Sequence, residues 1–194
     1  MRRFRQLLVI VVLVIVAGVG INRVIQRTSA NRTPVARTIR NKVAAPKRID
    51  WRAPSEEKDY PNLKTFPHAW LDVNTSKQRV YIRSGNKVLY TMYCSTGTGK
   101  DNATPHGTYY IQAERGKFFY NQNSGEGAKY WVSWKDHGIY LFHSVPTDKD
   151  GNYIESEAKQ LGKTAASHGC VRLSVADAKW VYNNVPYGMK VVIH

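Results

Sequence analysis

The sequence RVYIRSGNKVLYTMYC, from Arg79 to Cys94, has the pattern of two strands joined by a short turn. Apolar and polar side chains alternate before and after Ser84-Gly85-Asn86, whose composition is typical of a tight turn. An alternation with a period of two places one set of side chains on the buried face of a sheet. Val88 and Cys94 fall in the apolar set of the second strand, so we expect Cys94 to be a core thiol and not a disulfide partner.

Strand patterns recur through the rest of the chain, and only two segments carry helical signals. Ser174 is a good N-cap for the better-marked helix, and Asp177 occupies the capping-box position. The predicted strands cover residues 79–83, 87–94, 108–113, 130–134, 139–145 and 189–193, and the predicted helices cover 155–161 and Val175–Asn184. These elements predict a mostly β fold with one or two short helices.

The N-terminus has the composition of an export signal. Arg2, Arg3 and Arg5 precede residues 7–21, a run without any polar side chain. A basic segment followed by an apolar run at the start of a chain is typical of signal peptides and signal anchors. We predict an uncleaved, single-pass transmembrane helix over residues 1–27, with a cleaved signal peptide as the alternative. The rest of the chain would then lie outside the membrane that this helix crosses.

Residues 28–66 have the composition of a basic tether, with four prolines, nine Lys or Arg residues and no sustained apolar pattern. Residues 1–50 hold 11 Lys or Arg against one acid, so most of the net charge of +15 precedes the predicted domain, residues 67–194. Such a charge attracts an anionic membrane or wall polymer. We expect no nucleic-acid partner, because an exported chain rarely meets nucleic acid and no basic-aromatic module is present.

The segment Ser167-His168-Gly169-Cys170-Val171-Arg172 concentrates reactive residue types. A cysteine thiolate is a strong nucleophile, but a free thiol needs a neighbouring imidazole to activate it near neutral pH. Gly169 permits close approach of a substrate carbonyl to backbone N–H groups that can hold an oxyanion. Arg172 adds positive potential and is also able to pair with a substrate carboxylate.

His143 is the candidate base for this cysteine. It shares the face of its predicted strand with Ile139 and Leu141, so we expect its side chain to point inward. A nucleophilic cysteine and its histidine are usually adjacent in space and not in sequence. The two cysteines and scattered histidines have no metal-ligand spacing, and we expect neither a metal nor a cofactor.

These residues resemble the L,D-transpeptidase (YkuD-like) family, which has an upstream histidine followed by Ser/Thr-His-Gly-Cys. His143 and the Ser167–Cys170 stretch match that pattern, and Thr104-Pro105-His106-Gly107-Thr108 is similar to the family's Thr-Pro-x-Gly segment. Two departures stand out. The 23 residues between His143 and Ser167 suggest an insertion that forms a lid or wall, and Arg172 replaces the Asn that is often found there.

The resemblance implies a sandwich-like or barrel-like β fold and a role in peptidoglycan synthesis, cell-wall biogenesis and cell shape. It implies that Cys170 attacks a peptidoglycan stem peptide, with His143 as general acid and base. D-Ala is released, and the thioester then forms a 3→3 cross-link with a second stem. The loop and oxyanion support falls to Ser167, His168 and Gly169, and the expected substrate contacts are Arg172, Trp134 and Tyr130.

Three other functions fit the same residues. Water in place of the second stem would make the protein an L,D-carboxypeptidase. Another exported cysteine acyl-transfer enzyme of the wall would share the Cys170–His143 chemistry and differ in its products. A non-catalytic module that binds the wall through the basic tether is favoured by the charge and disfavoured by the Ser-His-Gly-Cys cluster.

Overall fold

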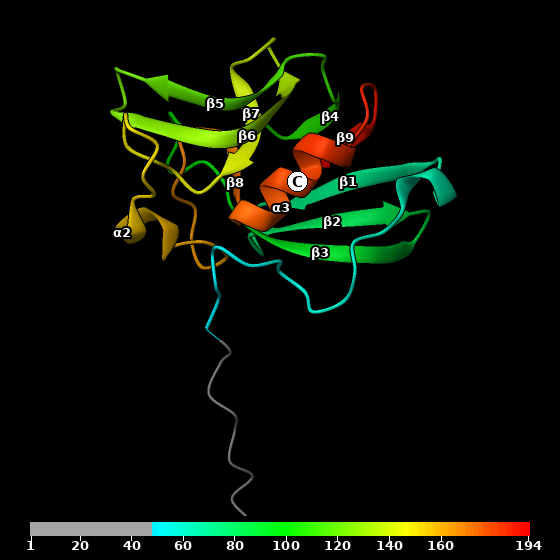
Figure 1. Cartoon of the computed structure of the whole chain (residues 1–194). Helices are drawn as coiled ribbons and strands as arrows, with labels where there is room; N and C mark the ends of the chain where they lie inside the picture. The colour runs from blue at the N-terminus through cyan, green and yellow to red at the C-terminus, as the bar shows by residue number, and fades with distance from the viewer. Residues whose placement is uncertain (1–47) are drawn as a thin grey trace, which may run out of the picture. The chain divides into compact units, whose positions relative to one another are not determined.

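A computed structural model describes residues 48–194 of the chain (Figure 1). The predicted anchor, residues 1–27, and the first part of the predicted tether lie outside the described residues. Within residues 48–194, none of the helices has the length and apolar character needed to cross a membrane.

The described chain is built around nine strands in the order β4-β9-β1-β2-β3-β8-β7-β6-β5. Neighbouring strands are antiparallel except for two parallel pairs, β1 with β9 and β7 with β8. The strands are β1 (Ala69–Asn74), β2 (Arg79–Ser84), β3 (Lys87–Ser95), β4 (Gly107–Tyr110), β5 (Arg115–Asn121), β6 (Glu126–Lys135), β7 (Tyr140–Ser144), β8 (Val171–Leu173) and β9 (Lys190–Ile193). The helices are a 3-10 turn, η1 (Leu63–Thr65), and two α-helices, α2 (Glu155–Ala158) and α3 (Val175–Asn184).

The sheet is strongly curled, and its curvature encloses the core. Gln112 N donates to Ser133 O at 2.8 Å and Ser133 N donates to Glu114 O at 2.9 Å, so the chain beyond β4 meets β6. Figure 1 shows α3 between the β1–β3 part of the sheet and the β5–β7 part. The helix buries Ala178 and Val181 in the main apolar cluster. The prediction of a mostly β fold with two short helices is confirmed.

The hairpin predicted between Arg79 and Cys94 is confirmed as β2 and β3. Val80 pairs with Met92 and Ile82 with Tyr90, and all four side chains are fully buried. The expected position of Val88 on the same face is wrong, because the register shifts between Ile82 and Arg83 and leaves Val88 exposed. Cys94 is a buried free thiol, as expected.

Helix α3 has the predicted bounds and the predicted cap, since the Ser174 side chain accepts a hydrogen bond from Asp177 N at 3.1 Å. The Asp177 carboxylate accepts hydrogen bonds from the hydroxyls of Ser55 and Tyr60. The helix predicted over residues 155–161 ends at Ala158, where it continues into turns.

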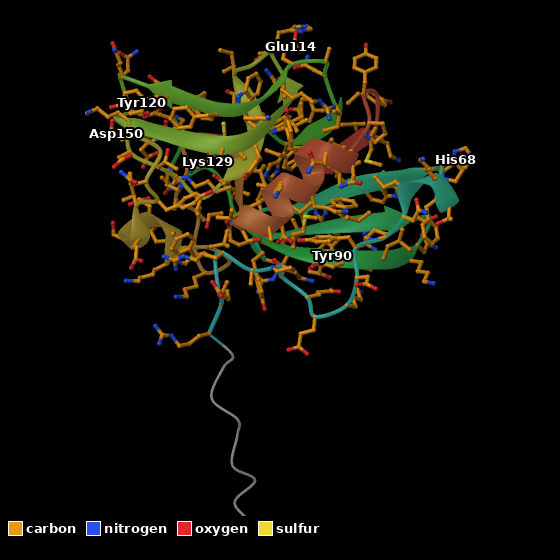
Figure 2. The ribbon with its side chains drawn as sticks, in the orientation of Figure 1. His68, Tyr90, Glu114, Tyr120, Lys129 and Asp150 are labelled. Carbon is orange, nitrogen blue, oxygen red and sulfur yellow. The ribbon has the colours of Figure 1, made fainter. Side chains whose placement is uncertain are left out.

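The end of the predicted tether, residues 48–66, packs against the folded domain. Trp51 is buried with Val145 and Leu161. Tyr60 stacks on Tyr90 at 4.6 Å between ring centroids and on Trp180 at 5.0 Å; Figure 2 labels Tyr90 on β3. The predicted domain boundary at residue 67 therefore differs from the structure, because a few large aromatic side chains are enough to dock this segment.

Candidate active site

The parallel pairing of β7 with β8 joins two segments that are distant in sequence. His143 on β7 lies opposite Arg172 on β8, and Cys170 immediately precedes β8. Because side chains alternate along a strand, Cys170 and Arg172 share one face of β8. The sheet therefore brings the candidate nucleophile and base to one place.

The site is a pocket of about 370 Å³ between β5, β6, β7 and the loop before β8. It contains His143, Ser167, His168, Cys170 and Arg172, all of which the sequence had indicated. The other lining residues are Phe119, Asn121, Ser124, Glu126, Gly127, Trp131, Gly138, Ile139, Leu141 and Pro146. The predicted inward orientation of His143, together with Leu141, is confirmed.

The Cys170 thiol is partly buried in the wall of this pocket. Its Sγ lies 3.6 Å from the carbonyl oxygen of Ile139, which accepts its hydrogen bond. Desolvation raises the pKa of the thiol to about 11, against the opposing effects of a backbone hydrogen bond at Leu141 and the charge of Arg172. The thiol is therefore protonated at neutral pH and needs a base to react.

His143 is buried and held in one tautomer. Its Nδ1 lies 2.6 Å from the carbonyl oxygen of Ser144, which only accepts hydrogen bonds, so Nδ1 carries the proton and Nε2 the lone pair. Phe119 packs edge-on against the ring at 5.7 Å between centroids. Desolvation, followed by the charge of Arg172, lowers the pKa of His143 to about 3. The imidazole is thus neutral, with Nε2 able to accept a proton.

The loop before Cys170 is fixed by hydrogen bonds. Ser167 is buried, and its Oγ donates to Cys170 O at 2.6 Å and accepts from Gly169 N at 3.1 Å. Gly169 has φ +117°, and a Cβ there would lie 3.0 Å from Tyr140 Cε1. Thr104 Oγ1 donates to Gly169 O at 3.0 Å. The N–H of Gly169 is thus already in use, which conflicts with its expected role as an oxyanion donor.

Arg172 differs from expectation in its partners. Its side chain is 3% exposed, and its terminal nitrogens bind Glu157 Oε2 at 2.8 Å and Glu126 Oε2 at 2.7 Å. The expected pairing with a substrate carboxylate therefore conflicts with the structure, where protein carboxylates take both terminal groups. Glu157 belongs to α2, within the predicted insertion; of that insertion only Pro146 lines the pocket.

Two predicted substrate contacts lie outside the pocket lining. Trp134 is buried in the core, with its ring 4.9 Å from that of Tyr109 and 5.4 Å from that of Tyr140. Tyr130 packs against the same core at a positive φ of 57°. Trp131 lines the pocket instead. Alternation placed the two tryptophans on opposite faces of β6, but it did not indicate which face met the core.

The sequence reasoning missed Glu126 and Phe119 as pocket residues, since neither belongs to a motif. Glu126 begins β6 and Phe119 lies on β5, which pairs with β6 at the edge of the sheet. Phe119 lies on a strand that was not among those predicted, and Glu126 precedes the predicted strand over residues 130–134. Among residues 48–194, no group of three His, Cys, Asp or Glu residues is arranged to hold a metal ion.

Known proteins are similar to this chain in sequence. The sequence profile of the YkuD family, the L,D-transpeptidase catalytic domain, matches residues 68–193. A Bacillus subtilis (strain 168) protein named "Putative L,D-transpeptidase YciB" is 49% identical over 170 residues, which cover 87% of this chain and 83% of that protein.

Solved structures share the fold at low sequence identity. An L,D-transpeptidase from Mycobacterium smegmatis matches with a TM-score of 0.54 and 19% identity, over 66% of this chain and 58% of that one. One from Mycobacterium tuberculosis H37Rv matches with a TM-score of 0.53 and 22% identity, over 66% and 57%. The match thus spans less than two thirds of those solved chains. By its sequence profile and its similarity to the Bacillus subtilis relative, this chain belongs to the L,D-transpeptidase (YkuD) catalytic domain family.

Proposed function

We propose that this protein is a peptidoglycan L,D-transpeptidase that forms 3→3 cross-links through a thioester on Cys170. The observation that carries the proposal is that one pocket contains both the Cys170 thiol and a neutral His143 whose Nδ1 is already engaged. A protonated thiol beside a neutral imidazole is the starting state for general-base catalysis. Family membership supports peptidoglycan as the substrate class.

In the first half-reaction, Cys170 Sγ attacks the carbonyl between the third stem residue and the terminal D-Ala. Its proton passes to His143 Nε2 as the C–S bond forms. When the tetrahedral intermediate collapses, the C–N bond breaks and His143 returns the proton to the D-Ala amine. The Cys170 N–H is the candidate oxyanion donor, since Ser167 occupies the N–H of Gly169. Ser167 thus holds the loop before Cys170 in place, and the exposed side chain of His168 lies at the rim of the pocket.

In the second half-reaction, the side-chain amine of a second stem's third residue attacks the thioester carbonyl. His143 takes a proton from that amine, the C–S bond breaks, and the proton returns to the thiolate of Cys170. The product is an amide that links two third residues. Water as the acceptor gives a free carboxylate by the same steps, which is L,D-carboxypeptidase activity.

The test uses full-length protein with disaccharide tetrapeptides and reads the products by mass spectrometry. We expect wild type to release D-Ala and form 3→3 dimers, and to gain the mass of one carbapenem such as imipenem. Cys170→Ala should lose all three properties. Cys94→Ala is the matched control, because Cys94 is a free thiol outside the pocket. Wild type that neither releases D-Ala nor forms the adduct would contradict the proposal.

We also propose that residues 1–27 anchor the protein in the bacterial cytoplasmic membrane, with the basic residues that follow held near anionic lipid or wall polymer. The support is the apolar run 7–21 with arginines before it. Full-length protein should stay in the membrane fraction after alkaline carbonate extraction. Release into the supernatant would contradict an anchor.

A further inference from the structure

Three charged side chains meet at Arg172, two residues after Cys170. Arg172 is nearly inaccessible and is bound by two carboxylates, Glu126 on β6 and Glu157 on α2. Its Nε has no hydrogen-bond partner among residues 48–194. One positive charge therefore faces two negative charges, and the cluster carries one excess negative charge.

The excess charge is presented to the pocket by Glu126. Glu126 lines the pocket with 21% of its side chain exposed, whereas Glu157 is not among the lining residues. Two side chains lie near the Glu126 carboxylate, and both are close to Oε2. Arg172 Nη2 lies 2.7 Å from this oxygen and His168 Nδ1 lies 3.7 Å from it. In the described part of the chain, Oε1 has no hydrogen-bond partner. A carboxylate oxygen has room to accept further hydrogen bonds, so Oε1 is a free acceptor in this site.

We propose that Glu126 is a specificity-determining residue that binds the side-chain ammonium of the donor stem peptide's third residue. This inference rests on the proposed function, because it concerns the substrate of the same pocket. The ligand class is a peptide whose third residue ends in a free primary amine. A partly desolvated carboxylate binds an ammonium through charge-assisted hydrogen bonds, which are stronger than bonds between neutral groups.

The position of Glu126 suits the donor and not the acceptor. Arg172 lies two residues beyond Cys170, and the carboxylate that it holds lines the same pocket as the Cys170 thiol. The attacked carbonyl belongs to the third residue, and that residue's amine is separated from the carbonyl by its own side chain. The apolar surfaces of Phe119 and Trp131 line the same pocket and can cover the methylene groups between them.

Charge also separates the two substrates. The donor amine keeps its proton throughout thioester formation, so a carboxylate can hold it in every state of that step. The acceptor amine must be neutral when it attacks, so a carboxylate that stabilises its charged form would oppose the reaction. His143, which is neutral in the pocket, does not compete with the ammonium for Glu126.

The experiment measures the single-turnover rate of D-Ala release, with full-length protein in excess over each of two tetrapeptides, so that only the first half-reaction is followed and no acceptor amine is needed. One has a free amine on its third residue, and the other has that amine acetylated, which removes the charge and leaves the attacked carbonyl unchanged. We expect wild type to prefer the free-amine peptide by about tenfold, the size of one charge-assisted hydrogen bond. In Glu126→Gln the preference should fall to about one.

Glu157→Gln is the matched control, since it removes the other carboxylate from Arg172 without touching the lining of the pocket. This variant should keep the wild-type preference, whatever its effect on overall rate. Circular dichroism and thermal melting check that both variants fold. If a variant does not fold, the comparison of the two peptides on wild type decides, and equal rates overturn the inference.

An equal loss on both peptides in Glu126→Gln would also overturn the inference, because Glu126 would then act only by holding Arg172. D-Ala release by wild type would leave the proposed function standing in either case. Wild type that releases D-Ala from neither peptide contradicts the proposed function itself, and the inference with it.

Discussion

Cys170 and His143 both lose solvent where they line the pocket, and desolvation moves their pKa values in opposite directions. The thiol has its pKa raised to about 11 and the imidazole has its pKa lowered to about 3, so each neutral form is favoured. Arg172 lowers both pKa values, because its positive charge favours a thiolate and disfavours an imidazolium. The resting pair is therefore a thiol and a neutral imidazole, not an ion pair.

This state predicts how Cys170 reacts with iodoacetamide as pH changes. Only the thiolate is alkylated, and with a pKa near 11 its fraction should rise about tenfold per pH unit from pH 7 to pH 10. Measuring the alkylation rate by intact mass in Cys94→Ala protein isolates this thiol. A plateau below pH 8 would show instead that the free enzyme holds a thiolate beside an imidazolium.

At the scale of elements, the first turn of α3 is bound to the segment that precedes β1. Ser174 caps the helix, while the buried carboxylate of Asp177 accepts hydrogen bonds from Ser55 and Tyr60 in the segment before β1. Desolvation raises the pKa of Asp177, and the hydrogen bonds from Ser55, Tyr60 and Ser174 oppose the rise. This carboxylate thus joins the N-terminal segment to the helix that supports β6 and β7.

Replacing this carboxylate should destabilise the fold. Asp177→Ala leaves the partly buried hydroxyls of Ser55 and Tyr60 without their acceptor, and a buried unsatisfied group costs roughly 1–3 kcal/mol. We expect the free energy of unfolding, measured by urea denaturation, to fall by about 3 kcal/mol. Asp150→Ala is the control, since the Asp150 side chain is 64% exposed. Figure 2 labels Asp150 at the surface of the domain. Equal free energies of unfolding for the two variants would show that the hydrogen bonds of Asp177 to Ser55 and Tyr60 do not stabilise the fold.

At the scale of the whole molecule, the folded domain begins before the residues that match the family. The profile match starts at residue 68, but Trp51 and Tyr60 already contribute to the buried apolar clusters. Tyr60 packs against Tyr90 of β3 and Trp180 of α3, and Trp51 packs in a second cluster with Leu161. The segment therefore completes the core and is part of the domain.

Two truncations test this boundary. Residues 46–194 should show one cooperative thermal transition, because they contain the whole compact unit. Residues 67–194 lose the burial of two large aromatic side chains, each worth roughly 1.5–3 kcal/mol, and should melt at least 10 °C lower. Melting curves that coincide would show that residues 48–66 only lie on the surface.

Local patterns in the sequence accounted for most elements and for the composition of the site. Alternation identified the β2–β3 hairpin, and the Ser174 cap together with Pro186 and Gly188 identified the bounds of α3. The reactive loop was predictable because His, Gly, Cys and Arg are adjacent in the chain. Trp134 was misplaced because an alternating pattern distinguishes two faces of a strand without saying which one is covered.

The sequence by itself determined six of the nine strands in residues 48–194, with β1, β5 and β8 missed, where α3 begins and ends, and that a cysteine and an upstream histidine are present to react. Only the tertiary structure decided that β7 and β8 pair in parallel, which brings His143 and Cys170 into one pocket. It also decided that Glu126 and Glu157 both bind Arg172 and that Trp131 replaces Trp134 at the pocket wall. The reason is that strand patterns depend on neighbouring residues, whereas pairing, burial and charge balance depend on residues that are distant in the chain.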